Sequence, residues 1–200
     1  MTNISLNQFS PIRKNYLVFK PIQVNFEAGS FYHIRGENGV GKSTLLKTIV
    51  GIHNAYAGEM NVPFSLEDML YFYDAPVVRE DWTVLDSLKF YAEIDEATLS
   101  DTVLEMLLAQ LKLDRIYDHK MSQISLGQLK RVYMARLIFK NHAKIWLLDE
   151  PISSLDVTGV KILNYLIYIF LKKGGMVIAT GHHDLFEHVT RVIDLKCEVA

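Results

Sequence analysis

The sequence contains very little cysteine and no long apolar run. Of its 200 residues only Cys197 is a cysteine, so an intrachain disulfide is excluded. This composition is typical of a reducing compartment. No apolar run reaches the roughly 18 residues that a transmembrane helix needs, and residues 1–10 are too polar for a signal peptide. We therefore expect any membrane role to come through a partner.

An excess of charge of either sign is also absent. The chain has 21 lysines and arginines against 23 aspartates and glutamates, which gives a net charge of -2 and a pI near 6.4. Broad nucleic-acid binding usually requires a basic surface, so we expect no nucleic-acid partner. Half of the residues are hydrophobic, which allows one domain with a sizeable core.

Hydrophobic patterning predicts an α/β protein. Alternating or continuous apolar runs predict strands, and apolar residues spaced by three and four predict helices. In the helix at 99–113, the residues Leu99, Val103, Met106, Leu107 and Leu111 form one apolar face, which we expect to pack into the core. The predicted strands are 4–9, 22–26, 30–35, 145–148, 176–180 and 192–195, and the predicted helices are 44–50, 85–92, 99–113 and 129–139.

A glycine-rich segment follows the predicted strand 30–35 and opens the predicted helix 44–50. Residues 36–43 fit the pattern G-x-x-x-x-G-K-[ST], in which backbone N–H groups and the helix N-terminus form an anion site. We expect the lysine to contact the phosphates of ATP and the serine hydroxyl to bind Mg²⁺. The predicted nucleotide-binding residues are Gly36, Glu37, Asn38, Gly39, Val40, Gly41, Lys42, Ser43 and Thr44.

Two adjacent acids follow the buried strand 145–148, about a hundred residues later. A carboxylate at the end of such a strand binds Mg²⁺ in many nucleotide enzymes, and Asp149 is predicted to do so together with Ser43. Glu150 is then the predicted general base, which would polarise the attacking water.

Three further segments carry a resemblance to ABC-type ATPases. Residues 124–128, Ile-Ser-Leu-Gly-Gln, resemble their signature motif, usually Leu-Ser-Gly-Gly-Gln. Residues 147–156 resemble the Walker B segment with its D-loop, and residues 180–182 resemble the switch-histidine segment. The order and spacing hold from Gly36 to His182, so the resemblance covers nearly the whole chain.

The resemblance implies a P-loop NTPase core with a mainly parallel sheet, an antiparallel β subdomain and a helical insert. The catalytic core would comprise residues 1–64 and 126–200, and the helical subdomain residues 65–125. It also implies a head-to-tail dimer, in which Ser125, Gly127 and Gln128 of a second copy complete the ATP site. His182 would act with Glu150 in catalysis, and Asp156 would communicate between the two sites.

Several residues depart from the family pattern. Leu126 replaces the first signature glycine, and Asp74 stands near the position of the Q-loop glutamine. The register implies Arg13 where an aromatic residue usually stacks on adenine, with Tyr16 as the alternative. His183 is a rival to His182 as the switch histidine.

Within the family, the chain resembles the ATPase of the bacterial haem exporter that serves cytochrome c maturation (the CcmA type). The residues that carry this likeness are Arg13, 17–19, Gly29, 34–36, 70–72 and 82–91. It implies ATP and Mg²⁺ as cofactors, integral-membrane permease subunits as partners, and a cytoplasmic protein held at the inner face of the cell membrane. The alternatives are another compact ABC transporter ATPase, a weakly hydrolysing regulatory module, or a non-transport ABC protein acting on DNA or ribosomes.

Overall fold

The computed structural model describes residues 3–73, 79–182 and 185–197. The chain divides into two compact units, described one at a time below. The first comprises residues 1–74, 142–151 and 168–200, and the second comprises residues 75–141 and 152–167. No helix in the described part of the chain combines the length and the apolarity needed to cross a lipid bilayer.

The first unit contains an antiparallel sheet built around the long strand β1 (Ile4–Arg13). Strand β1 pairs with β2 (Tyr16–Leu17), β3 (Ile22–Phe26) and β5 (Tyr56–Asn61). The predicted strands 4–9 and 22–26 are therefore confirmed. Strand β5 has no buried residue and no regular alternation of burial, which explains why the apolar pattern did not predict it.

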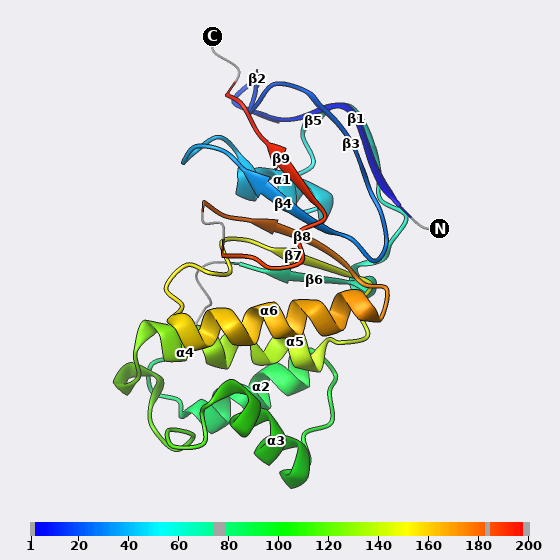
Figure 1. Cartoon of the computed structure of the whole chain (residues 1–200). Coiled ribbons are helices and arrows are strands. Elements are labelled where there is room, and N and C mark those ends of the chain that lie inside the picture. Colours follow the sequence, from blue (N-terminus) through cyan, green and yellow to red (C-terminus); the bar gives the residue numbers. More distant parts are fainter. Residues whose placement is uncertain (1–2, 74–78, 183–184, 198–200) are drawn as a thin grey trace. The chain divides into compact units, whose positions relative to one another are not determined.

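A parallel sheet forms the other layer of the first unit, and its strands run in the order β6-β7-β8-β4-β9 (Figure 1). Strands β7 and β8 are buried at every position, as their continuous apolar sequences predict. The mainly parallel sheet and the antiparallel sheet confirm the predicted α/β class. The bounds are β4 (Phe31–Arg35), β6 (Met69–Phe72), β7 (Ile145–Leu148), β8 (Met176–Thr180) and β9 (Arg191–Asp194).

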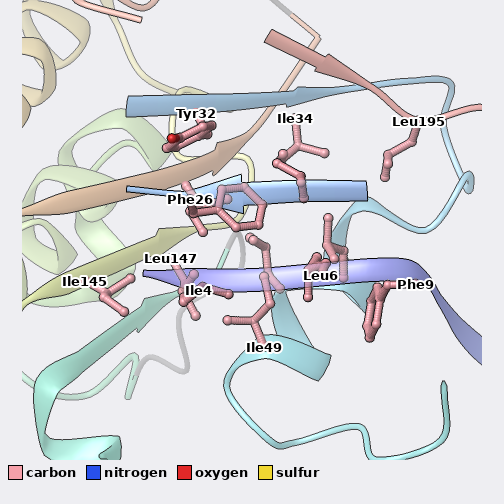
Figure 2. Packing of buried hydrophobic residues seen from close by; sticks show 14 of the residues in the cluster. Ile4, Leu6, Phe9, Phe26, Tyr32, Ile34, Ile49, Ile145, Leu147 and Leu195 are labelled. Atoms are coloured by element: carbon pink, nitrogen blue, oxygen red, sulfur yellow. The ribbon is translucent and has the colours of Figure 1, made fainter. Parts of the chain in front are cut away.

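The core of the first unit lies between its two sheets and includes helix α1 (Lys42–Ile49). Side chains from both sheets and from α1 meet in one cluster (Figure 2). The fully buried members from the antiparallel sheet are Ile4, Phe9 and Phe26, and they pack in the same cluster as Leu147 and Ile178 of the parallel sheet. This packing fixes the strand ends from which the site residues project.

Gly51 follows the last residues of helix α1 and ends the helix. It adopts a left-handed φ of 81°, which glycine tolerates without a Cβ clash. The Gly51 N–H donates to the Thr48 carbonyl, and the Ile52 N–H donates to the Lys47 carbonyl. These two bonds are those of a Schellman motif, which satisfies the last carbonyls of a helix.

The second unit is helical. It contains α2 (Val84–Ile94), α3 (Asp101–Leu111), α4 (Leu126–Tyr133), α5 (Ala135–Phe139) and the first part of α6 (Val157–Lys172). The single helix predicted at 129–139 is two helices, separated at Met134. The short 3-10 turns η1 (Leu66–Asp68) and η2 (Met121–Gln123) lie in the first and second unit respectively.

The predicted core face of α3 is wrong at two positions. Val103 is 39% exposed and Met106 is 68% exposed, whereas Leu107, Leu108 and Leu111 are buried. The buried face is rotated by one residue from the predicted face. Both sets recur at spacings of three and four, so helical periodicity alone could not separate them.

The two compact units have boundaries other than those of the predicted subdomains. Strand β6, within the predicted insert at 65–125, belongs to the parallel sheet of the first unit. Helices α4 and α5, within the predicted core segment 126–200, belong to the helical second unit. The subdomain boundaries given by the resemblance stay a prediction.

A buried ion pair joins α5 to the end of α2 in the second unit. Arg136 Nε and Nη2 donate to the two oxygens of Asp95 at 2.9 and 2.8 Å, and the Asp95 side chain is 1% exposed. Burial lowers the pKa of Arg136, but the hydrogen bonds to Asp95 and its charge outweigh burial, so the pKa is raised overall. The guanidinium therefore stays charged, and its carboxylate partner is needed to compensate that charge.

We predict that Asp95→Asn destabilises the protein by about 3 kcal/mol, because it leaves a buried guanidinium charge without a compensating carboxylate. Urea unfolding followed by circular dichroism measures this change. The matched control is Asp81→Asn, which breaks the exposed pair with Arg79 and should leave the unfolding midpoint unchanged. Equal effects of the two substitutions would contradict the assigned role of the pair.

Candidate functional site

The site of the first unit lies where strands β4, β7 and β8 of the parallel sheet end. The loop at residues 36–41 connects β4 directly to helix α1. Glu37, Asn38 and Gly39 are exposed in this loop, whereas Val40 is 2% exposed and belongs to the core cluster. The buried side chain of Val40 thus anchors the loop in the core, and residues 37–39 face solvent.

Gly41, the residue before α1, has a backbone that requires glycine. Its φ is 110°, a region that other residues rarely adopt. A Cβ atom at this position would also lie 2.2 Å from Cγ1 of Val18. This conformation brings the loop into the first turn of α1, where helical N–H groups and the positive end of the helix dipole favour an anion.

Lys42 is the first residue of α1 and is 7% exposed. Its ammonium nitrogen lies 2.9 Å from the carbonyl oxygen of Gly36 and 3.3 Å from that of Glu37. It also lies 2.8 Å from Nε2 of His182 and 3.7 Å from Oε1 of Glu150. The predicted phosphate-binding lysine therefore contacts both residues that the sequence analysis assigns to catalysis.

The chemistry of Lys42 gives the direction of its hydrogen bond to His182. An ammonium group only donates hydrogen bonds, so Lys42 is the donor to Nε2 of His182. Oε1 of Glu150 lies 3.5 Å from the same Nε2. Lys42 thus donates a hydrogen bond to the imidazole and forms an ion pair with the carboxylate.

Ser43 and Asp149 are spaced as two ligands of one Mg²⁺ ion. The Ser43 hydroxyl donates to Oδ1 of Asp149 at 2.9 Å. Neighbouring oxygens around an octahedral Mg²⁺, with bonds of about 2.1 Å, are about 3.0 Å apart. Both groups are also oxygen ligands, which Mg²⁺ prefers, so the two residues fit the ion that the sequence predicts.

Asp149 is buried, at 5% exposure, and two further hydroxyls hold its carboxylate. Thr180 of β8 donates to Oδ1 at 2.8 Å, and Tyr71 of β6 donates to Oδ2 at 3.2 Å. The sequence analysis assigned neither residue a role in the site. A polar residue at the carboxyl end of the apolar strand β8 was the available signal for Thr180, and no comparable signal marks Tyr71.

Glu150 leaves strand β7 with an unusual backbone. Its φ is 45°, a left-handed value that is uncommon for a residue other than glycine. Its N–H donates to the Thr180 hydroxyl at 2.9 Å. Such backbone strain persists where the surrounding structure enforces it, and it is frequent at functional sites.

The signature-like segment lies in the second unit, at the N-terminus of α4. The Ser125 hydroxyl accepts from the N–H of Gln128 at 3.2 Å, and the Gln128 side-chain oxygen accepts from the N–H of Ser125 at 2.9 Å. This is a reciprocal capping box. The Ser125 hydroxyl also has a proton to donate, whereas the Gln128 oxygen serves the helix cap.

The two residues between Ser125 and Gln128 differ in their surroundings. Leu126 is 70% exposed at the first position of α4. Gly127 approaches the D-loop, because a Cβ atom there would lie 3.2 Å from the carbonyl oxygen of Ser154. Leucine is accommodated at 126 because its side chain points away from the packed interior.

Asp156 connects the D-loop to two helices of the second unit. Its Oδ1 accepts from the Gly159 N–H at 2.7 Å in the first turn of α6. Its Oδ2 lies 3.8 Å from Nη2 of Arg131, a residue of α4. The D-loop and the helix that follows the signature segment are thereby joined within one unit.

Both candidates for adenine stacking lie on one hairpin. Arg13 at the end of β1 and Tyr16 at the start of β2 are paired across the strands, and both are exposed. The turn between them, Lys14 and Asn15, has left-handed φ values of 49° and 68°. The choice between Arg13 and Tyr16 stays open.

Two of the alternatives fall outside the described residues. Asp74, the candidate at the Q-loop position, and His183, the rival switch histidine, both lie there. His182 is described, and the structure brings it together with Lys42 and Glu150.

Comparison with known proteins identifies a family. The ABC transporter family matches residues 19–153. A relative from Reclinomonas americana, the cytochrome c biogenesis ATP-binding export protein CcmA, is 33% identical, and the alignment covers 92% of this chain and 86% of the relative. The protein of the same name from Saccharophagus degradans is 34% identical, with 92% and 89% covered.

Solved structures show the same fold. A putative ABC transporter ATP-binding protein from Pyrococcus furiosus superposes with a TM-score of 0.82 at 24% identity, and covers 96% of this chain and 97% of its own. An ATP-binding subunit of an ABC transporter gives a TM-score of 0.75 at 21% identity, with 90% and 80% covered. The chain therefore belongs to the ABC transporter family, as an ATP-binding subunit homologous to the CcmA proteins of cytochrome c biogenesis.

Proposed function

We propose that this chain hydrolyses ATP at the site formed by the loop 36–44 and the carboxyl ends of β7 and β8, and that hydrolysis drives a membrane complex. One observation carries the proposal: Lys42, Glu150 and His182 converge within 3.7 Å of one another beside the Ser43 and Asp149 pair. A phosphate-binding cation, a base and two metal ligands are the groups that phosphoryl transfer to water requires.

The phosphates of ATP would bind over the loop 36–44. The N–H groups at the start of α1 and the helix dipole attract the negative charge. The Lys42 ammonium already contacts two loop carbonyls, the His182 ring and the Glu150 carboxylate. A phosphate would replace some of these contacts, which hold the ammonium in the site before the ligand binds. The side chain is therefore preorganised for its ligand.

Ser43 and Asp149 would hold the Mg²⁺ ion together with the phosphates. Mg²⁺ usually binds through one or two carboxylates and substrate phosphates, and the spacing of these two oxygens suits it. When bound, the ion neutralises charge that develops on the phosphate oxygens.

Glu150 would be the general base that takes a proton from the attacking water, and His182 would position this water and the terminal phosphate. Glu150 is held by Lys42 and by its left-handed backbone, and its side chain is 25% exposed. Partial exposure admits water to the carboxylate.

A second copy of the chain would complete the site with Ser125 and Gly127 of its α4 N-terminus. The Ser125 hydroxyl can donate to a phosphate while it accepts from the Gln128 N–H. Gln128 would contribute through the helix cap, because its side-chain oxygen accepts from the Ser125 N–H. Asp156, tied to both α4 and α6, would communicate between the two sites.

The membrane partner would be a permease of the haem-export type. The curated relatives carry "cytochrome c biogenesis" and "export" in their names, and the alignments span most of both chains. The ATPase would lie at the inner face of the cell membrane through integral-membrane subunits.

We predict that Gly41→Ala lowers the affinity for ATP by at least about tenfold, because a Cβ atom clashes with Val18 and the backbone strain costs about 1–3 kcal/mol. Fluorescent ATP titration measures the affinity. The control is Gly51→Ala, which has a similar left-handed φ but open space around its Cβ. This variant should lose stability and keep its ATP affinity; equal losses of affinity would contradict the assignment of the loop.

We predict that Glu150→Gln lowers ATP turnover by about 100- to 10,000-fold and leaves ATP binding intact, because a general base contributes a factor of this size. Lys42→Ala should weaken binding itself by about 100-fold, since it removes charged hydrogen bonds to phosphate. Phosphate release and ATP titration separate the two effects. Glu93→Gln, an exposed acid of α2, is the control. Unchanged turnover in Glu150→Gln would remove this residue as the base.

We predict that Leu126→Ala strengthens ATP-dependent dimerisation about three- to tenfold, or on the order of 1 kcal/mol. The reason is that a bulky side chain stands where the second copy would approach the nucleotide. Light scattering of the Glu150→Gln protein with ATP measures the dimer. Met106→Ala, which shortens a similarly exposed side chain on α3, should have no effect. Weaker dimerisation of Leu126→Ala would contradict this role.

A further inference from the structure

We propose that Thr180 is the positioning residue that aligns both acids of the site, Asp149 through its side chain and Glu150 through its backbone. The inference rests on the proposed function, in which Asp149 binds the metal and Glu150 is the base. Thr180 is the last residue of β8, and it is fully buried. Strand β8 lies next to β7, the strand that leads into both acids.

The directions of the two hydrogen bonds of Thr180 follow from its chemistry. The Glu150 N–H can only donate, so the Thr180 oxygen accepts at 2.9 Å. The single hydroxyl proton then goes to Oδ1 of Asp149 at 2.8 Å. One hydroxyl thus holds the side chain of one acid and the backbone of the next, and a change in its position would move both.

The contact with Asp149 is suited to a metal ligand. Oδ1 also accepts from Ser43, and Oδ2 accepts from Tyr71. If Ser43 binds Mg²⁺ through its hydroxyl oxygen, the bonds from Thr180 and Tyr71 still fix the orientation of the carboxylate. Partners of this kind, which hold a metal ligand from behind, typically change metal affinity or activity by about 10- to 100-fold when removed.

The contact with Glu150 addresses a different requirement. Glu150 has a left-handed φ of 45°. This conformation costs about 1–2 kcal/mol for a residue with a Cβ, so it needs a compensating contact. The bond from the Glu150 N–H to Thr180 supplies it. The left-handed turn directs the Glu150 side chain toward Lys42 and His182, which lie 3.7 and 3.5 Å from its Oε1.

The comparison of Thr180 with Tyr71 separates the two functions. Tyr71 donates to the Asp149 carboxylate, whereas Thr180 bonds to both acids, to the carboxylate of Asp149 and to the backbone N–H of Glu150. Loss of the Tyr71 hydroxyl should therefore weaken the metal site. Loss of the Thr180 hydroxyl should weaken the metal site and also misplace the base.

The test uses Thr180→Val, which keeps the shape of the side chain and removes its hydroxyl. We predict that the ratio of ATP affinity with Mg²⁺ to that with EDTA falls about tenfold, measured by calorimetry in the Glu150→Gln protein, where ATP is not consumed. In the protein with Glu150 intact, kcat at saturating Mg²⁺ should fall about 10- to 100-fold with little change in KM. Tyr71→Phe should also lower the affinity ratio, and it should lower kcat at saturating Mg²⁺ less than Thr180→Val does.

Two further variants are the controls. Thr180→Ser retains the hydroxyl and should restore the affinity ratio and kcat. Thr190→Val removes a hydroxyl that accepts the Phe31 N–H away from the site, and it should change neither quantity. A folded Thr180→Val protein with a normal affinity ratio and a normal kcat overturns the inference, as does an equal loss in Thr190→Val. Normal turnover in Glu150→Gln alone would instead overturn the base assignment, and the Mg²⁺ affinity ratio would still test Thr180 separately.

Discussion

The burial of the Asp149 carboxylate is the constraint on which the rest of the site depends. A buried carboxylate is costly unless hydrogen bonds satisfy its oxygens. Here hydroxyls from α1, β6 and β8 do so, at 2.8 to 3.2 Å. Each comes from a different segment of the chain, and those of Tyr71 and Thr180 reach the carboxylate because β7 lies between β6 and β8. The strand order and the position of the carboxylate therefore depend on each other.

The same strand order explains why the loop after β4 and the acids after β7 lie close together. The loop 36–41 follows β4, and the acids follow β7, with β8 between these strands. Parallel strands place their carboxyl ends at one edge of the sheet, so three connections separated in sequence open on one side. Because β8 is the intermediate strand, its last residues can contact both neighbours. Thr180 bonds to the acids of β7, and His182, just beyond β8, reaches Lys42.

The parts of the site that could be predicted from the sequence are those whose chemistry is local. The glycine and lysine pattern of the loop requires only its own backbone and the helix that follows, and the apolar strand before Asp149 and Glu150 is visible without any knowledge of its neighbours. Thr180 and Tyr71 could not be predicted, because their importance depends on which strands lie beside β7. The face of α3 was wrongly predicted for a similar reason. Only packing shows that Leu108 is buried and that Val103 and Met106 are exposed, because both faces fit a helical period.

Leu126 stands in place of the first signature glycine. Its position separates the needs of the single chain, which must fold at the start of α4, from those of the contact with a second copy. The start of α4 needs a cap and a close approach to the D-loop, and Ser125, Gln128 and Gly127 provide these without the missing glycine. Leu126 itself is 70% exposed, so its side chain is not part of this packing. A leucine can therefore replace the glycine at little cost to the fold of the single chain. Any effect of this replacement must appear where another surface meets the N-terminus of α4, and hence in the proposed encounter with a second copy.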